Sequence, residues 1–174
     1  MIKRALEAGL IEMAVTNPRD FTKSRHRQVD DTIYGGGAGM LMMCQPLFDA
    51  CHHVLPEKGP RDRVIFLSPA GKTFNQDKAK ELQRDYDHLV LICGHYEGVD
   101  HRVEEHLADE LISIGDYVLT GGELGAMVIS DAVARMVPGV LGDAGSAATD
   151  SFYEPILEYP QYTKPAEYNG WKVP

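Results

Sequence analysis

The 174-residue chain has few cysteines, and no apolar run approaches the ~20 residues that a helix needs to span a bilayer. The three cysteines, Cys44, Cys51 and Cys93, form no C-x-x-C pair. This disfavours a disulfide framework and indicates reduced thiols. The N-terminal residues MIKRALEAGLIEM lack the long apolar stretch and the small-residue cleavage site of a signal peptide. We therefore expect a cytoplasmic protein with no membrane partner.

Basic residues are also scarce, because 17 Lys and Arg stand against 26 Asp and Glu, for a net charge of −9. This balance excludes a general attraction to nucleic acid, since phosphate contacts need Lys and Arg. One stretch departs from it. The basic segment, residues 19–27 (RDFTKSRHR), carries Arg19, Lys23, Arg25 and Arg27 against a single acidic residue, Asp20. An isolated charge cluster of this kind is more often a solvated loop, and its position just before a glycine-rich loop strengthens the alternative of a nucleic-acid contact.

Several motifs that would indicate other functions are incomplete. PAGKT (residues 69–73) resembles the end of a phosphate-binding P-loop, but the required earlier glycine is replaced by Phe66. GGGAG (residues 35–39) has neither the G-x-G-x-x-G spacing nor a strand directly before it, which disfavours a dinucleotide site. The seven histidines form no H-E-x-x-H motif and no tight Cys/His cluster. We therefore expect no metal site.

Expected helices and strands alternate along the chain. The sequence predicts helices at 1–8, 45–55, 75–84, 100–107 and 123–137, and strands at 11–15, 63–68, 88–93 and 110–114. Gly9 would end the first helix, Asn75 and Asp100 would cap the third and fourth, and Pro138-Gly139 would stop the last. Strands separated by helices predict an α/β fold with a mostly parallel sheet flanked by helices.

Three glycine-bearing loops each follow an expected strand: residues 67–71 (LSPAG), 93–98 (CGHYEG) and 114–122 (IGDYVLTGG). In open α/β sheets, ligands bind beyond the carboxyl ends of the strands. Glycines there let backbone amides approach a ligand closely. Any one such loop is usually only a turn. Three in series, with few lysines or arginines among them, favour a nucleoside ligand over a polyphosphate.

Several stretches closely resemble the bacterial tRNA (guanine-N1) methyltransferase family. In chain order they are NPRDF, the stretch from HRQVDD to YGGGAGM, LSPAG, CGHYEGVD with Arg102, SIGDYVLTGGE, RMVPGVLG and ATDSF. The combination of SIGDYVLTGGE with CGHYEG is the most specific. The resemblance implies a homodimeric α/β fold with a deep C-terminal trefoil knot, a feature that topology rules treat as a rare exception.

The resemblance also implies a domain layout. Residues 1–142 are expected to form the knotted catalytic domain that binds S-adenosylmethionine, without the first strand of family members. Residues 143–174 are expected to form a linker and tail that lead to a C-terminal tRNA-binding domain, which this chain lacks. The composition of the second part fits a linker, because GDAGSAATDS is small and polar and the remainder is rich in Pro and Tyr.

Carried over position by position, the family's cofactor contacts fall on the three loops. The resemblance implies that S-adenosylmethionine contacts Leu67, Ser68, Pro69, Gly94, Tyr96, Glu97, Ile114, Gly115, Asp116, Tyr117, Val118 and Leu119, with Gly121 and Gly122 closing the pocket. The catalytic aspartate matches Asp150 and its partner arginine matches Arg135. Glu97 matches a residue near the target guanine or the methionine part of the cofactor. A requirement for Mg²⁺ stays open, without a site.

Arg135 can also be examined without the family. On the last expected helix, Leu124, Val128, Asp131 and Arg135 share one side at 3.6-residue spacing. An ion pair between Asp131 and Arg135 is one interpretation, since they are four residues apart. The apolar residues on that side indicate burial or an interface, where an arginine suits recognition of an anion or a carbonyl oxygen. For Asp150, a helix cap or a solvated linker position are the alternatives.

The implied reaction is methyl transfer from S-adenosylmethionine to N1 of the guanine beside the anticodon of tRNA, in an active site shared between two subunits. Guanine N1 carries a proton, for which Asp150 is the candidate base. Arg135 or backbone amides would stabilise the charge on the guanine oxygen. One alternative is a module that binds S-adenosylmethionine or RNA without turnover because of truncation. Another, a knotted methyltransferase of ribosomal RNA, is disfavoured by the linked ATDSF and YGGGAGM segments.

Overall fold

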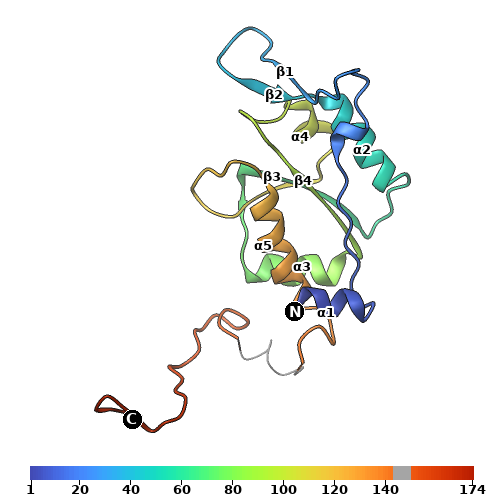
Figure 1. Ribbon diagram of the computed structural model, residues 1–174. Coiled ribbons are helices and arrows are strands. Elements are labelled where there is room, and N and C mark those ends of the chain that lie inside the picture. The colour runs from blue at the N-terminus through green and yellow to red at the C-terminus, as the bar shows by residue number, and fades with distance from the viewer. Residues whose placement is uncertain (143–149) are drawn as a thin grey trace.

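The computed structural model describes residues 1–142 and 150–174 (Figure 1). At its centre lies a three-stranded parallel sheet in the order β4–β3–β5, formed by His88–Cys93, Asp62–Thr73 and Glu110–Ser113. Residue Val64 of β3 faces Val90 of β4, and Phe66 faces Leu111 of β5. The expected parallel α/β sheet is confirmed. Residues 143–149, which belong to the expected linker, lie outside the described residues.

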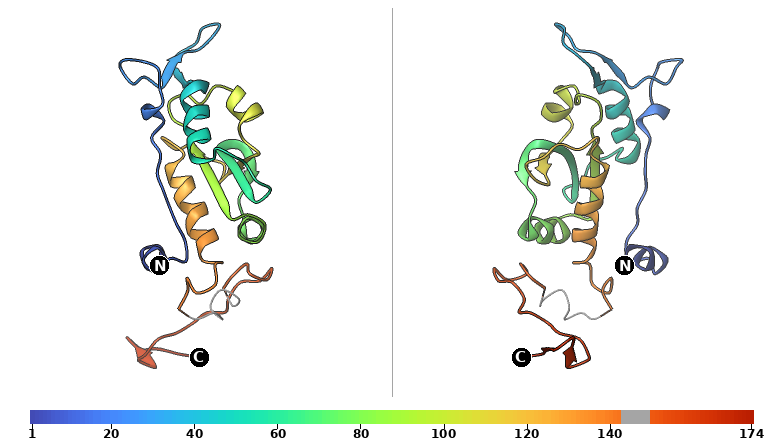
Figure 2. Two further views of the ribbon diagram at one scale, coloured as in Figure 1. Left: turned by 90° about the vertical axis from the view of Figure 1, so that its right-hand side faces the viewer. Right: turned by 60° about the vertical axis from the view of Figure 1, so that its left-hand side comes forward.

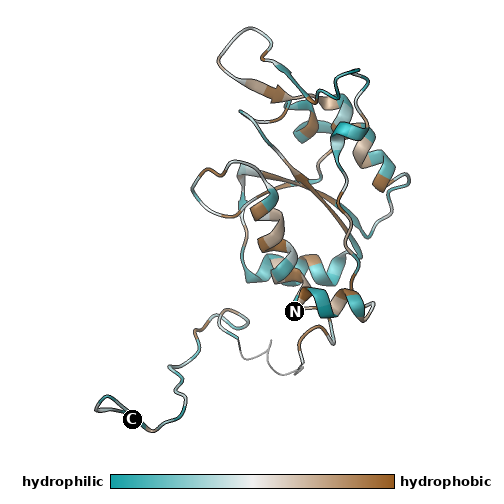
Figure 3. Ribbon diagram, in the orientation of Figure 1, coloured by the Kyte–Doolittle hydropathy of each residue, from teal (hydrophilic) through white to brown (hydrophobic). Residues whose placement is uncertain are grey.

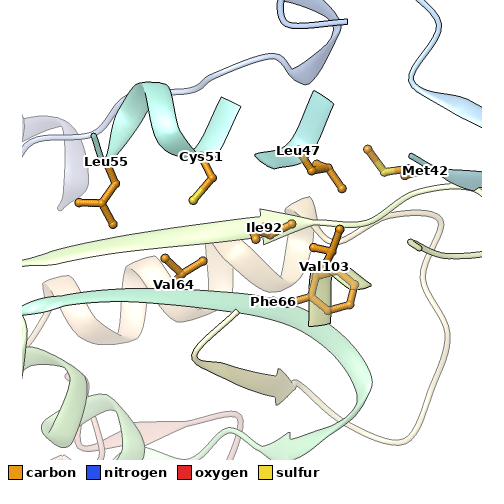
Figure 4. Close-up of a cluster of buried hydrophobic side chains, with 8 residues drawn as sticks. All are labelled: Met42, Leu47, Cys51, Leu55, Val64, Phe66, Ile92 and Val103. Atoms are coloured by element: carbon orange, nitrogen blue, oxygen red, sulfur yellow. The ribbon is translucent and has the colours of Figure 1, made fainter. Parts of the chain in front are cut away.

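Helices cover both faces of this sheet. Successive residues of β3 point to opposite sides, and its apolar residues on each side pack against helices. Val64 and Phe66 pack with Ile92 against α2 (Cys44–Val54) and α4 (Arg102–His106), in the cluster drawn in Figure 4. Ile65, between them, packs with Ile112 against α3 (Gln76–Asp85) and α5 (Glu123–Ala134). Figure 3 shows hydrophobic residues along the central strands. A strand buried on both faces needs the continuous apolar run that β4 carries.

The helix ends follow local chemistry. Asn75 caps α3, because its side chain accepts a hydrogen bond from the backbone N–H of Lys78 at 2.9 Å, as expected. The expected cap of α4 is displaced by one residue: His101 is the N-cap, while Asp100 accepts from the N–H of Arg102 at 3.1 Å. Helix α5 ends at Ala134, before the expected residue 137, and Arg135 is its C-cap.

The N-terminal part runs along the domain rather than entering the sheet. Helix α1 (Ile2–Glu7) is followed by Gly9 at φ +67°, which confirms the expected glycine end. The chain then extends to the short 3₁₀ helix η1 (Pro18–Asp20) at the far end of the domain (Figure 2). The strand predicted at 11–15 is wrong: these described residues form no strand, and Val15 is 100% exposed. Alternating apolar residues predict a strand only where a neighbouring strand is available to pair with it.

Two short hairpins complete the described chain. Strands β1 (Asp30–Thr32) and β2 (Met40–Met42) pair antiparallel around the glycine-rich loop. Strands β6 (Glu167–Tyr168) and β7 (Trp171–Lys172) pair near the C-terminus, in a tail that leaves the domain beside the end of α5 (Figure 1). Within the described part of the chain, no helix is long and apolar enough to cross a membrane.

Candidate functional site

One cavity of about 370 Å³ lies at the carboxyl edge of the parallel sheet. Three segments line it: the part of β3 at residues 67–69, the loop after β4 at 94–99, and the loop after β5 at 114–122. Parallel strands bring their carboxyl ends to the same edge, so segments far apart in the sequence meet there. The sequence prediction that these three loops form one site agrees with their placement.

The first segment is a bend inside β3, not a loop after it. The strand continues to Thr73, and its pairing with β5 shifts between Leu67 and Lys72. A Cβ on Gly71 would lie 2.5 Å from the backbone nitrogen of Ile112, so only glycine fits where the bend crosses β5. The sequence prediction for Gly71 is therefore corrected: its missing side chain serves the approach of β3 to β5, whereas Ser68 and Pro69 face the cavity.

The glycine-rich hairpin lies against the second segment. The backbone N–H of Glu97 donates to the carbonyl of Met40 at 3.1 Å, and the N–H of Met42 donates to the carbonyl of Gly98 at 2.9 Å. A Cβ on Gly39, which has φ +85°, would lie 2.2 Å from Cγ of Glu97. Gly39 thus allows the hairpin to pass directly beside Glu97 in the cavity wall.

The third segment is attached to the second by close backbone contact. The N–H of Gly122 donates to the carbonyl of Gly94 at 3.0 Å, and a Cβ on Gly122 would lie 2.7 Å from Cα of Cys93. At the other end of the loop, Gly115 has φ +148° and its N–H donates to Oγ of Ser113 at 3.1 Å. A larger residue at Gly122 would clash with Cys93, and a residue with a side chain at Gly115 would strain the backbone. The shape of the loop therefore requires glycine at both positions.

The carboxylic acids in the cavity wall have no lysine or arginine beside them among the described residues of that wall. These carboxylic acids are Glu97 and Glu104. Nearby, Nε2 of His95 lies 2.5 Å from Oε1 of Glu123. Partial burial raises the pKa of Glu123, but the hydrogen bond with His95 outweighs it, and the net pKa lies below the usual value. Burial, with the nearby Glu123 charge, raises the pKa of Cys93 to about 11, so this thiol is neutral.

Arg135 and Asp150 form an ion pair at the opposite end of α5 from the cavity. The sequence left open a local pair between Arg135 and Asp131, but the carboxylate that contacts the guanidinium is that of Asp150. The twelve residues of α5 span about 18 Å at about 1.5 Å per residue. Since α5 begins at the cavity rim beside Gly122, the pair lies far from the cavity of the same chain.

An apolar groove connects the two ends of α5. It has a volume of about 730 Å³. Its walls are formed by Gln76, Ile114, Tyr117, Leu119, Leu124, Met127, Val128, Asp131, Ala132 and Arg135. This agrees with the expected common side of Leu124, Val128, Asp131 and Arg135. Leu124, Met127 and Val128 are exposed there, so α5 presents an uncovered apolar face in a single chain.

The basic segment reaches the cavity through Tyr96. Nη2 of Arg19 donates to the Tyr96 hydroxyl at 2.8 Å, and Nη1 donates to the carbonyl of Arg27 at 2.9 Å. Arg27 is paired with Asp20. All four basic residues of the segment are exposed: Arg19, Lys23, Arg25 and Arg27. Arg19 therefore brings the basic segment to the cavity, and Arg27 is held next to Arg19 in the same segment.

Comparison with known proteins identifies the family of this chain. A family model described as tRNA (Guanine-1)-methyltransferase TrmD matches residues 1–174. The chain belongs to this family. A tRNA (guanine-N(1)-)-methyltransferase of Halalkalibacterium halodurans is 53% identical over 174 residues, which cover 100% of this chain and 70% of the relative. Enzymes with the same name from Desulforamulus reducens and Ruminiclostridium cellulolyticum are 55% and 52% identical, with 100% of this chain and 68% and 74% of the relatives covered.

Most residues that the family resemblance assigned to the cofactor gather at one place. Of the assigned set, the cavity is lined by Leu67, Ser68, Pro69, Gly94, Tyr96, Glu97, Ile114, Gly115, Tyr117, Val118, Leu119, Gly121 and Gly122. Asp116 is not among the described residues that line it. Sequence reasoning missed His95 and Glu123, which are 28 residues apart and carry no spacing signal. It also missed Glu104, which enters the cavity wall from α4.

The cavity of this methyltransferase family member suits S-adenosylmethionine on three counts. Its volume lies within the roughly 300–1,000 Å³ typical of small-molecule sites. Its glycine-bearing walls expose backbone groups that can read an adenine edge. Its wall contains Glu97 and Glu104 and, among the described lining residues, no lysine or arginine, which suits a ligand with a positively charged sulfonium. Residues 1–142 and 150–174 contain no group of three potential metal ligands. A Mg²⁺ requirement thus stays a prediction without a site.

Proposed function

We propose that this protein transfers a methyl group from S-adenosylmethionine to N1 of the guanine beside the anticodon of tRNA. The observation that carries the proposal is the family match over residues 1–174, together with relatives of the same name that cover the whole chain. The cavity at the carboxyl edge of the sheet supports it, because most residues assigned to the methyl donor line that one space.

The cavity residues would hold the methyl donor mainly through backbone groups. The cofactor supplies an electrophilic methyl group on a sulfonium centre. Gly94, Gly115 and Gly122 line the cavity, and their missing side chains let the neighbouring loops pack closely into one wall around the donor. Glu97 lies in the wall and is suited to bind the amino group of the methionine part or the edge of the target guanine. The neutral thiol of Cys93 would not compete as a nucleophile for the methyl group.

Asp150 is the proposed base that removes the guanine N1 proton. An ordinary aspartate, with a pKa of about 3.9, is a weak base for so weak an acid. Stabilisation of the charge that develops on the guanine oxygen is therefore needed, and an arginine can provide it. The ion pair between Arg135 and Asp150 supports this division of roles, because it brings the proposed base and the proposed charge stabiliser together.

The distance between cavity and base favours a homodimer with shared active sites. Within one chain, about 18 Å of helix α5 separates the cavity rim from Arg135. A second copy packed on the apolar groove of α5 would cover Leu124, Met127 and Val128. A two-fold interface brings the same patch of both subunits together, so the Arg135 end of one subunit can approach the cavity of the other.

Binding of tRNA would depend on the basic segment, since the net charge of −9 gives no general attraction. Contact of Arg19 with Tyr96 places this segment beside the cavity, where phosphates of an extruded guanosine would pass. We further propose residues 1–142 as the catalytic domain with the family's trefoil knot, residues 143–174 as linker and tail, and a cytoplasmic location. These proposals depend on the family resemblance.

A radiolabelled methyl-transfer assay tests the function. Matched tRNA transcripts carry guanine or adenine next to the anticodon, and binding of S-adenosylhomocysteine is measured separately by calorimetry. We expect label only in the guanine transcript. Binding of S-adenosylhomocysteine without methyl transfer would support the alternative of a binding module without turnover. Equal labelling of both transcripts would refute the proposed target base.

A further inference from the structure

The residues around Asp150 form a compact turn of their own. In this Asp150 turn, residues 150–158, the N–H of Tyr153 donates to the carbonyl of Asp150 at 3.1 Å. The N–H of Glu158 donates to Oγ of Ser151 at 3.0 Å. These bonds link the two ends of the turn, so its position as a whole decides where the carboxylate of Asp150 lies.

Two side chains from the domain hold this turn. Arg135, at the end of α5, pairs with the carboxylate of Asp150. Lys80, on α3, donates through Nζ to the carbonyl oxygen of Tyr153, and the same Nζ lies 4.2 Å from the centroid of the Tyr153 ring. A cation over an aromatic ring and a charge-assisted hydrogen bond are separate interactions that here share one ammonium group.

The surroundings of Lys80 favour the contact with the turn over a local role on α3. Apart from Tyr153, the ammonium group of Lys80 lies 3.9 Å from the carboxylate of Asp77, whose side chain is 89% exposed. The Lys80 side chain itself is only 30% exposed. An exposed ion pair at this distance contributes little. The ring and carbonyl of Tyr153 are therefore the principal partners of Lys80.

Attachment at two points restricts the turn more than the ion pair alone. Helices α3 and α5 pack against each other, and Nε2 of Gln76 at the start of α3 contacts Sδ of Met136 just beyond α5 at 3.1 Å. Lys80 and Arg135 therefore lie on two helices that are packed against each other. A single contact at Arg135 would leave the turn free to rotate about Asp150, whereas the second contact, three residues further along the chain at Tyr153, removes that rotation.

We propose that Lys80 is a positioning residue for methyl transfer, which holds the Asp150 turn through Tyr153 so that Asp150 is presented beside Arg135 before tRNA binds. This inference rests on the proposed function, in which Asp150 is the base. Lys80 touches neither Asp150 nor the cavity, so it acts through Tyr153. A turn that is already ordered saves part of the conformational entropy that tRNA binding would otherwise have to overcome.

Hydrogen exchange of the Asp150 turn tests the contact without any assay of activity. In Lys80→Ala, we expect the amides of Tyr153 and Glu158 to exchange about tenfold faster, which corresponds to about 1.4 kcal/mol. Lys80→Arg keeps a cation that can reach both partners and should restore slow exchange. Asp77→Asn removes the carboxylate near Lys80 and is the matched control, for which we expect unchanged exchange. Unchanged exchange in Lys80→Ala would overturn the proposal.

Kinetics then separate positioning from general stability. We expect Lys80→Ala to lower kcat/KM for tRNA about tenfold with unchanged affinity for S-adenosylhomocysteine, and Lys80→Arg to rescue it. Tyr153→Phe keeps the ring and should remain normal, whereas Tyr153→Leu removes the ring but keeps the backbone carbonyl and should cause a smaller loss than Lys80→Ala. Normal turnover of Asp150→Asn would refute the proposed base and with it the role of Lys80. Impaired Asp150→Asn together with normal Lys80→Ala would overturn only the positioning role.

Discussion

Subunit mixing gives the sharpest test of the separation between the cavity and the proposed base. Two variants are needed, each defective in one part. Asp150→Asn removes the proposed base at the far end of α5. Gly115→Val alters the cavity, because Gly115 has φ +148° and a Cβ there would lie 2.4 Å from the ring of Tyr117. We expect Asp150→Asn alone to lose about 10²–10⁴-fold of its methyl-transfer rate while it retains affinity for the cofactor.

The size of the recovery follows from the geometry. About 18 Å of α5 lies between the cavity rim and Arg135, so an active site assembled across a dimer takes its cavity from one chain and its base from the other. After free exchange of equal amounts, about half of the dimers are mixed, and each has one intact site out of two. The mixture should therefore recover about a quarter of the activity of the unaltered protein.

The assay is methyl transfer to tRNA after the two variants are exchanged under mild denaturation and refolded together. A chain that carries both changes, mixed with the unaltered protein, is the control. Shared sites predict about a quarter of full activity in this control, whereas sites within one chain predict about half. No recovery in the mixture of single variants, combined with half activity in the control, would refute the shared site. Arg135→Ala should lose as much as Asp150→Asn, and the two losses should not add, because both groups act on one transition state.

Three further predictions concern other parts of the molecule. Gly71→Ala should lower the free energy of unfolding by roughly 1–3 kcal/mol in chemical denaturation, because the added Cβ would lie 2.5 Å from the backbone of Ile112. Gly142→Ala is the control and should be nearly neutral, because no atom of the described residues lies within 4 Å of its added Cβ. Equal effects of the two changes would contradict the packing argument. Replacing the four cations of the basic segment should weaken tRNA binding and flatten the slope of log affinity against log salt by roughly one unit for each lost phosphate contact, and an unchanged slope would identify a solvated loop. Alkylation of Cys93 in the folded protein should increase with pH until about 11, where its thiol ionises, and a plateau near the ordinary thiol pKa of ~8.5 would contradict the burial argument.

Several elements could be predicted because their signals are local. The continuous apolar run LVLIC predicts a buried strand, and β4 spans His88–Cys93 as expected. Asn75 caps α3 because its side chain reaches an N–H only three residues away. By contrast, the predicted strand at 11–15 was wrong, since no periodicity within a segment reveals whether a neighbouring strand exists. The bend in β3 was missed for a related reason: the register shift at Leu67 is set by β5, more than 40 residues later.

In the candidate site, too, the residues within short motifs could be predicted, whereas the contacts between distant side chains could not. The order and spacing of SIGDYVLTGGE, CGHYEG and LSPAG identified the family and most of the cavity-lining residues, because motifs preserve chemistry in a short stretch of chain. The contacts between distant side chains carried no such signal. His95 with Glu123, Arg19 with Tyr96 and Lys80 with Tyr153 are each joined by the fold alone.

Thus the sequence by itself determined the parallel α/β class, the family and the three segments that form the cavity. Only the tertiary structure decided that the glycine-rich hairpin lies beside Glu97, that Gly71 serves the crossing of two strands, and that Arg135 and Asp150 meet at the end of α5 remote from the cavity. The physical reason is range: propensity, capping and periodicity act over a few residues, whereas the path of the chain through space decides which distant side chains and backbones come into contact.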